Sequence, residues 1–183
     1  MKVSREQVQQ HRERVLGAAA RLFRERGFDG VSVAEVMKAA GLTHGGFYGH
    51  FDSKDSLIRE ALAYGKTLGW YRGADAQSAA DYADAYLSTR HRDNRGSGCP
   101  IASLGPEASR ASADVRATLT GSIRRQIDRF SAASPGTTPA QRRRAAIAAY
   151  SVMVGAVVLA RIVDDEKLSD EILGAARRSI ELD

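Results

Sequence analysis

The sequence has little of what stabilises small cross-linked proteins or β-sheet proteins. Cys99 is the only cysteine in 183 residues, so neither a disulfide nor a cysteine-based zinc site can form within one chain. Four prolines and only 7% aromatic residues leave little room for the turns and strands of a sandwich or barrel. We therefore predict an all-α protein, which is long enough to bury a core without covalent cross-links.

Signals for export, membrane insertion and catalysis are also missing. The start, MKVSREQVQQ, lacks the apolar core of a signal peptide, so we expect a cytoplasmic protein. The longest apolar run, 145–160, is shorter than the roughly 20 residues that cross a bilayer, which predicts a buried helix and no membrane partner. There is no Gly-rich phosphate loop and no HExxH motif, and the four histidines have neither ligand nor triad spacing. We expect no cofactor, no metal and no enzymatic activity.

The charge of the chain has a mild positive bias. The net charge of +5 suits a polyanionic partner but does not require one. It divides into +3 for residues 1–66 and +2 for the remainder, so charge alone does not locate a binding region.

The first part of the chain contains strong signals for the starts of helices. Ser4 and Gln7 have the spacing of a capping box, in which two side chains satisfy exposed backbone donors. Apolar residues then recur at helical intervals as far as Gly27, a typical C-terminal cap. Ser32 and Glu35 have the same capping-box spacing. We therefore predict a long first helix and a short second one.

A glycine-bearing turn follows the second helix. Gly41 stops that helix after barely two turns, and Thr43 is positioned to cap a third short helix. Asp52 or Ser53 can cap a fourth. Helices this short are marginal alone in water, so apolar side chains of the first and fourth helices must hold them. Two short helices joined by such a turn predict a helix-turn-helix.

The polar residues of this region carry the functional signal. The stretch 40–57 resembles the DNA-binding signature of TetR-type transcriptional regulators (the TetR/AcrR family), which is roughly AGxxxGxxYxHFxxKxxL. Its fixed positions are filled by Ala40, Gly41, Gly45 or Gly46, Tyr48, His50, Phe51, Lys54 and Leu57. The resemblance implies a helix-turn-helix DNA-binding domain at residues 1–65 and a helical ligand-binding and dimerisation domain at residues 66–183.

The expected DNA contacts are polar side chains and glycines in or near this stretch. Thr43 and His44 would stand at the start of the recognition helix, where base edges are read, and Lys54 begins a helix whose N-terminus favours a phosphate. Because glycines replace larger residues at two positions, we expect part of the specificity to come from DNA shape. Ser32 and Thr43 can also act as caps, and His50 can instead pack beneath the first helix. The full set is Ser32, Thr43, His44, Gly45, Gly46, Tyr48, His50 and Lys54.

The remaining residues predict longer helices separated by loops at 72–77, 89–98 and 133–139. A capping box at Thr138 opens a helix that continues to about Val163, and Ser169 is positioned to cap a final helix. The run 145–160 is apolar on nearly all sides, which a monomer surface would not tolerate. In TetR-type regulators the last two helices pair with a second subunit, so the resemblance implies a homodimer. The predicted interface comprises Tyr150, Ser151, Val154, Gly155, Val158, Ile172 and Ala176.

The resemblance also implies a pocket for a small-molecule effector among the middle helices. Cys99 lies in an expected flexible loop near three arginines and just before a helix, where a thiolate would be favoured. The segment 98–105 resembles a TetR-like subgroup with a Gly-Cys-Pro sequence, and some family members sense electrophiles through a cysteine. Ordinary core packing is the alternative for Cys99 and for the other candidates. They are Trp70, Tyr82, Tyr86, Cys99, Ile101, Leu104, Leu119, Ile123 and Ile127.

These observations predict a repressor that binds a palindromic double-stranded DNA operator as a homodimer and leaves it when an effector binds. Two alternatives keep the same fold: a redox- or electrophile-responsive regulator that acts through Cys99, and a DNA-binding regulator without an effector.

Overall fold

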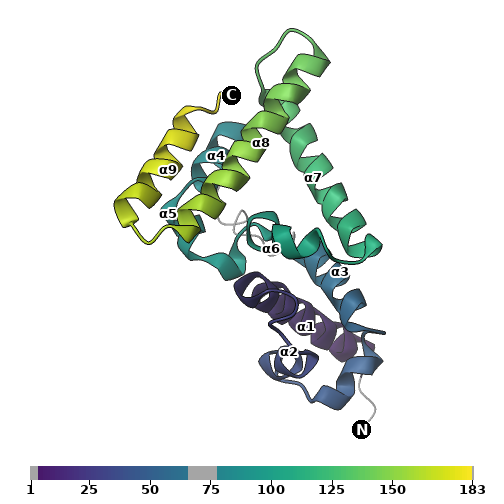
Figure 1. The fold of residues 1–183 in the computed structure, drawn as a ribbon. Coiled ribbons are helices and arrows are strands. Elements are labelled where there is room, and N and C mark those ends of the chain that lie inside the picture. The colour runs from purple at the N-terminus through teal and green to yellow at the C-terminus, as the bar shows by residue number, and fades with distance from the viewer. Residues whose placement is uncertain (1–3, 66–77, 183) are drawn as a thin grey trace.

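The computed structural model describes residues 4–65 and 78–182, and within these ranges it contains helices and no strand, which confirms the all-α prediction. Figure 1 shows the arrangement of the helices. Their bounds are α1 Arg5–Arg26, α2 Val33–Ala39, the 3-10 helix η1 His44–Gly49, α3 Lys54–Tyr64, α4 Ala79–Tyr86, α5 Thr89–Asp93, the 3-10 helix η3 Arg95–Ser97, α6 Pro100–Ala108, α7 Ala113–Ala133, α8 Pro139–Ile162 and α9 Glu166–Arg178.

Hydroxyl side chains cap many of these helices. Capping boxes begin α1 at Ser4, α2 at Ser32 and α8 at Thr138, as predicted. For α3 the cap is Ser53 and not Asp52. Each such cap is typically worth about 1 kcal/mol.

The start of α9 differs from the prediction. Asp165 is its cap, and the carboxylate of Asp165 accepts hydrogen bonds from two backbone N–H groups of the first turn. Ser169, which we predicted to be the cap, lies inside α9 with its side chain buried, and its hydroxyl donates to the carbonyl of Ala160 at 2.7 Å. Both residue types are good caps, so the sequence alone did not separate them.

The prediction of a loop at 89–98 is also wrong. This segment forms α5 and η3, two helices of five and three residues. Hydrophobic periodicity cannot reveal elements so short. The loop at 133–139 is where α7 ends and α8 begins, as predicted, and the loop at 72–77 lies outside the described residues.

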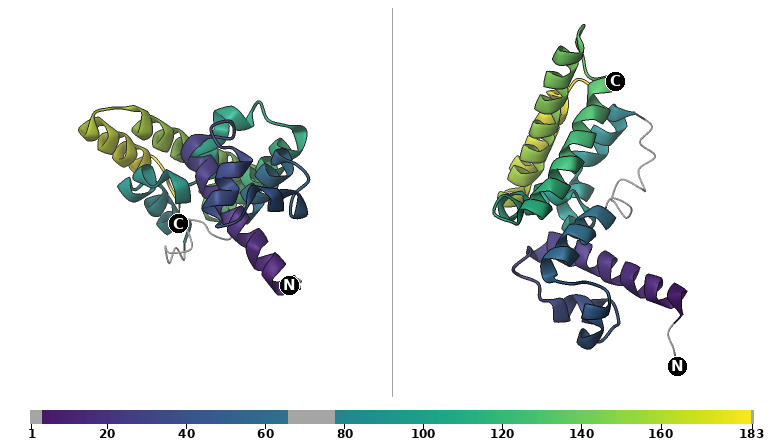
Figure 2. Two further views of the ribbon diagram at one scale, coloured as in Figure 1. Left: turned by 90° about the horizontal axis from the view of Figure 1, so that it is seen from below. Right: turned by 90° about the vertical axis from the view of Figure 1, so that its right-hand side faces the viewer.

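The helices bury two hydrophobic cores. The N-terminal core contains residues of α1, α2, η1 and α3, together with Leu104 and Ala108 of α6 and Val115 and Leu119 of α7. The C-terminal core is formed by α4, α6, α7, α8 and α9. Figure 2 shows the N-terminal helices gathered at one end, from which α1 projects. α6 and α7 contribute to both cores, so they connect the two parts of the chain.

Two polar contacts reinforce this connection. The Nε of buried Arg24 in α1 donates to the carbonyl of Gly96 at 2.8 Å. The carboxylate of Glu107 in α6 accepts a hydrogen bond of 2.5 Å from the backbone N–H of Phe28. These two contacts join η3 and α6 to the helices at the N-terminal end.

Candidate functional site

The helix-turn-helix consists of α2, the turn after it and η1. Gly41 in this turn has a φ of 69°, in the left-handed region that residues with side chains rarely adopt. The N–H of Leu42 donates to the carbonyl of Met37 at 2.9 Å and closes the turn. Val36, Met37 and Phe47 are buried in the N-terminal core. A few apolar side chains therefore fix both short helices on α1 and α3.

The predicted third short helix is present as η1, but Thr43 does not cap it through its side chain. η1 is a 3-10 helix, in which the N–H of Gly46 donates to the carbonyl of Thr43 at 3.1 Å. Thr43 occupies the N-cap position, but its hydroxyl makes no capping hydrogen bond. The sequence of η1, HGGFYG, contains three glycines, which favour helix less than any residue but proline. Phe47 is its only buried side chain, so little packing energy is available to impose regular α-helix.

The structure brings most of the predicted DNA contacts together on one exposed surface. Tyr48 is 74% exposed although it is aromatic, and no apolar core could use it there. Lys54 begins α3 beside this segment and is half-buried. The exposed residues of the surface are Thr43, His44, Gly45, Gly46, Tyr48 and Gly49.

Ser32 acts primarily as a helix cap. Its hydroxyl donates to a carboxylate oxygen of Glu35 at 2.8 Å and accepts from the N–H of Glu35 at 3.2 Å. The hydrogen bonds from the backbone and the hydroxyl of Ser32, followed by that from Arg26, lower the pKa of Glu35 to about 2. Ser32 can bind a phosphate through its hydroxyl only if that hydrogen leaves Glu35.

His50 packs against the first helix. Its ring lies 6.5 Å from the ring of His11 in an edge-on arrangement, and its Nδ1 has no hydrogen-bond partner among the described residues. Burial lowers the pKa of His50, and the positive charges that His11 and Arg12 can carry lower it further. His50 is therefore neutral near pH 7.

Comparison with known proteins agrees with this geometry. The sequence model of the family described as "Bacterial regulatory proteins, tetR family" matches residues 15–61, the span from α1 to α3. Residues 15–61 are thus similar to the segment that defines the tetR family of bacterial regulatory proteins. The chain is 39% identical over 57 residues to the regulator AcrR of Shigella flexneri, a match that covers 31% of this chain and 26% of AcrR. The match therefore spans only about a quarter of the length of AcrR.

Longer similarities extend over the C-terminal helices. An uncharacterised regulator of Mycobacterium tuberculosis, Rv0196, is 29% identical over 170 residues, covering 84% of this chain and 86% of that protein. A TetR regulator from Chloroflexus aurantiacus has a similar crystal structure, with a TM-score of 0.77, 24% identity and 96% of each chain covered. These proteins are named as regulators, in agreement with the prediction that the chain is not an enzyme.

Helix α8 has one buried and one exposed apolar side. By length and composition it could cross a membrane, but 39% of its most apolar window is buried within the chain. On the opposite side Leu159 is 54% and Ile162 is 71% exposed. A side chain added at Gly155 would meet no atom within 4 Å. The exposed side thus carries several large apolar side chains.

The predicted dimer residues divide between these two sides. Tyr150 and Ala176 point into the C-terminal core of their own chain, so the interface we propose omits them. Ser151 is exposed, and four residues are half-buried: Val154, Gly155, Val158 and Ile172. Sequence analysis missed the exposed residues Ile147, Val152, Leu159, Ile162 and Leu168, of which the first four lie on α8.

The predicted effector residues are not all neighbours. Leu104 and Leu119 belong to the N-terminal core, which makes them packing residues between α6, α7 and the DNA-binding helices. Trp70 lies outside the described residues. The residues that do pack in or against the C-terminal core are Tyr82, Tyr86, Cys99, Ile101, Ile123 and Ile127.

Cys99 is not in a flexible loop. It is the N-cap of α6, only 6% exposed, and its N–H donates to Nε2 of His91 at 2.9 Å. Nδ1 of the same imidazole lies 2.7 Å from the carbonyl of Tyr86 and carries the ring proton, since Nε2 is an acceptor. Burial, the largest influence, lowers the pKa of His91 to about 4 and raises that of Tyr86. Cys99 is therefore buried, and its backbone N–H is held by a neutral imidazole.

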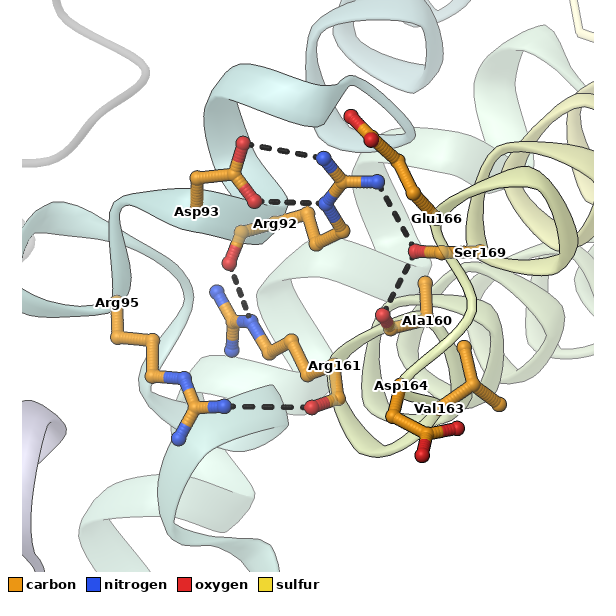
Figure 3. A pocket seen from close by; sticks show the side chains of 9 residues that line it. All are labelled: Arg92, Asp93, Arg95, Ala160, Arg161, Val163, Asp164, Glu166 and Ser169. Carbon is orange, nitrogen blue, oxygen red and sulfur yellow. Dashed lines mark hydrogen bonds and ion pairs between the residues drawn. The ribbon is translucent and has the colours of Figure 1, made fainter.

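A polar cleft of about 400 Å³ lies elsewhere, where α8 ends and α9 begins (Figure 3). The guanidinium of Arg161 donates to the carbonyls of His91 and Arg92, and Arg92 donates to Asp93, Ser169 and Asp170. Since these groups satisfy one another, the network fastens α5 to α8 and α9. Residues 69 to 78 positions apart meet here, so no local sequence pattern indicated it.

Proposed function

We propose that this regulator is a cytoplasmic repressor that binds a palindromic double-stranded DNA operator as a homodimer and is released by a small-molecule effector. The observation that carries the proposal is the exposed surface of η1, where Thr43, His44 and Tyr48 face solvent beside Lys54. Residues 1–65 would form the DNA-binding domain, and residues 66–183 the effector and dimer domain.

The chemistry of this surface suits the two kinds of contact that a regulator makes with DNA. Thr43 and His44 begin η1 and can reach base edges with a hydroxyl and an imidazole. The hydroxyl of Tyr48 and the ammonium of Lys54 can bind phosphates on either side, which fixes the position of the protein on the duplex. Gly45 and Gly46 between them offer no side chain. Hence few bases would be read directly, and DNA shape would supply part of the specificity.

A second copy of the chain would double this contact. No element among residues 4–65 and 78–182 covers the exposed apolar side of α8, and apolar patches of this kind typically bury against a partner. Two η1 elements related by a twofold axis would enter successive major grooves, about 34 Å apart, and so read a palindrome.

Effector release requires a path from the C-terminal core to η1. The candidate effector residues lie around α4, α6 and α7, and α6 contacts the turn before α2 through the Glu107–Phe28 hydrogen bond. A ligand that shifts α6 would therefore change the orientation of the DNA-binding helices. It can shift the equilibrium only as far as it binds one arrangement more tightly than the other.

Electrophile or redox sensing by Cys99 is the second candidate mechanism. Its support is the position of Cys99 as the N-cap of α6, because the N-terminus of a helix favours a thiolate. The burial of the thiol favours the effector mechanism instead. A regulator without any effector is the third possibility, and it predicts no release by any small molecule.

The deciding experiment is selection of DNA by the purified protein from a random duplex pool. The proposal expects enriched palindromes with half-sites about one duplex turn apart, and a protein–DNA complex containing two chains. Release is then tested by adding small molecules to the complex on the selected duplex. Failure to enrich any sequence would contradict operator binding, and enrichment of a single unrepeated site would contradict the dimer.

A further inference from the structure

The DNA-facing segment contains glycines that the fold does not use. Gly45, Gly46 and Gly49 make up half of η1. Glycine in a helix loses more conformational freedom on folding than any other residue. Each of these glycines therefore destabilises η1, in which Phe47 is the only buried side chain. A fold requires glycine for one of two reasons: φ is positive, or neighbouring atoms leave no space for a β-carbon.

Backbone geometry does not supply the reason. Positive φ values occur, within the described residues, at Gly27, Gly41 and Gly136 and at none of the glycines of η1. The turn after α2 requires glycine at position 41 because φ is positive there. Gly45 and Gly49 do not have positive φ values, so alanine can adopt their conformations readily.

The surrounding protein does not supply it either. A β-carbon added at Gly30 would come within 2.2 Å of the backbone carbonyl oxygen of Arg26, so that glycine is needed for packing. A β-carbon added at Gly45 or Gly49 would meet no atom within 4 Å. Both positions open onto solvent beside Tyr48, on the surface that carries the expected DNA contacts.

We propose that Gly49, together with Gly45, seats the sugar–phosphate backbone of the operator directly against the main chain of η1. This inference rests on the proposed DNA-binding function and adds Gly49 to the contact surface. A side chain at position 49 would occupy the space that the duplex takes, and would hold Tyr48 and Lys54 away from their phosphates. At this position the DNA would contact main-chain atoms of Gly49 instead of a side chain.

The test compares two alanine substitutions that are matched in the free protein. Gly49→Ala is made in η1, and Gly105→Ala is made in α6, where an added β-carbon also meets nothing within 4 Å. Binding to the duplex selected by the wild-type protein is measured by fluorescence anisotropy, and thermal unfolding is measured on the same samples. We expect Gly49→Ala to bind at least tenfold more weakly with an equal or higher Tm, and Gly49→Leu to bind more weakly still. Gly105→Ala should keep wild-type affinity.

The outcomes separate this inference from the function on which it rests. If the wild-type protein selects no duplex, operator binding itself is wrong. If the wild type binds and Gly49→Ala binds equally well, DNA does not approach Gly49 and the inference fails. Loss of affinity together with a lower Tm would also overturn it, because the glycine would then serve the fold.

Discussion

Nε2 of His91 accepts a 2.9 Å hydrogen bond from the N–H of Cys99, and this contact fixes the point at which α6 begins. The same ring donates through Nδ1 to the carbonyl of Tyr86 at the end of α4. The bond to Nε2 requires the neutral imidazole, since a protonated ring has no acceptor, whereas Nδ1 can donate in either state. One buried side chain thus joins α4, α5 and α6, and it does so only in one protonation state.

Stability should consequently fall on mild acidification. The pKa of His91 is lowered to about 4 in the folded chain against 6.5 for an ordinary histidine, so the unfolded chain binds the extra proton first. The stabilisation is complete above pH 6.5 and is lost as the pH falls towards 4, by up to about 3 kcal/mol. Urea unfolding at pH 7.5 and pH 5 measures this loss. His91→Gln should flatten the pH dependence, whereas His44→Gln on the exposed surface should leave it unchanged. An equal pH dependence in the wild type and His91→Gln would contradict the assignment.

Cys99 gives a second prediction, because its burial favours a structural role. We expect Cys99→Ser to leave operator release by a mild electrophile unchanged from the wild type. The measurement is release of labelled duplex after treatment with a small thiol-reactive compound. If release disappears in Cys99→Ser, the sensor mechanism is correct and the buried thiol becomes accessible during function.

The sequence could predict features whose physical cause is local. Capping boxes at Ser4, Ser32 and Thr138 need only residues three apart, and the exposed polar residues of η1 lie within the stretch that the ordered motif marks. The 3-10 form of η1 depends on how little of it is buried, and the cleft at Arg92 and Arg161 joins distant segments. Such features arise from tertiary packing, which periodicity and propensity do not encode.

DNA binding itself should depend on Tyr48 and Lys54 without regard to base sequence. Tyr48→Phe removes only a hydroxyl from a 74% exposed ring, so affinity should fall by about tenfold with no change in thermal stability. Lys54→Ala should lower affinity on all duplexes and reduce the slope of log K against log salt by about one. Lys167→Ala, on exposed α9, is the matched control and should leave the slope unchanged. A wild-type slope in Lys54→Ala would show that this ammonium does not contact the phosphates.

Dimerisation should depend on the exposed side of α8. Gly155→Asp adds a charge where the free chain has open space, so the monomer should fold normally while a second copy would have to bury an unpaired carboxylate. We expect this variant to sediment as a monomer and to bind a palindromic duplex at least a hundredfold more weakly, because one η1 then holds one half-site. Ala132→Asp adds the same charge at an exposed position of α7 and should remain dimeric. Analytical ultracentrifugation and binding to full and half palindromes measure both effects. A stable Gly155→Asp dimer would place the interface on another surface, and equal affinity for full and half palindromes in the wild type would mean that one chain suffices for recognition.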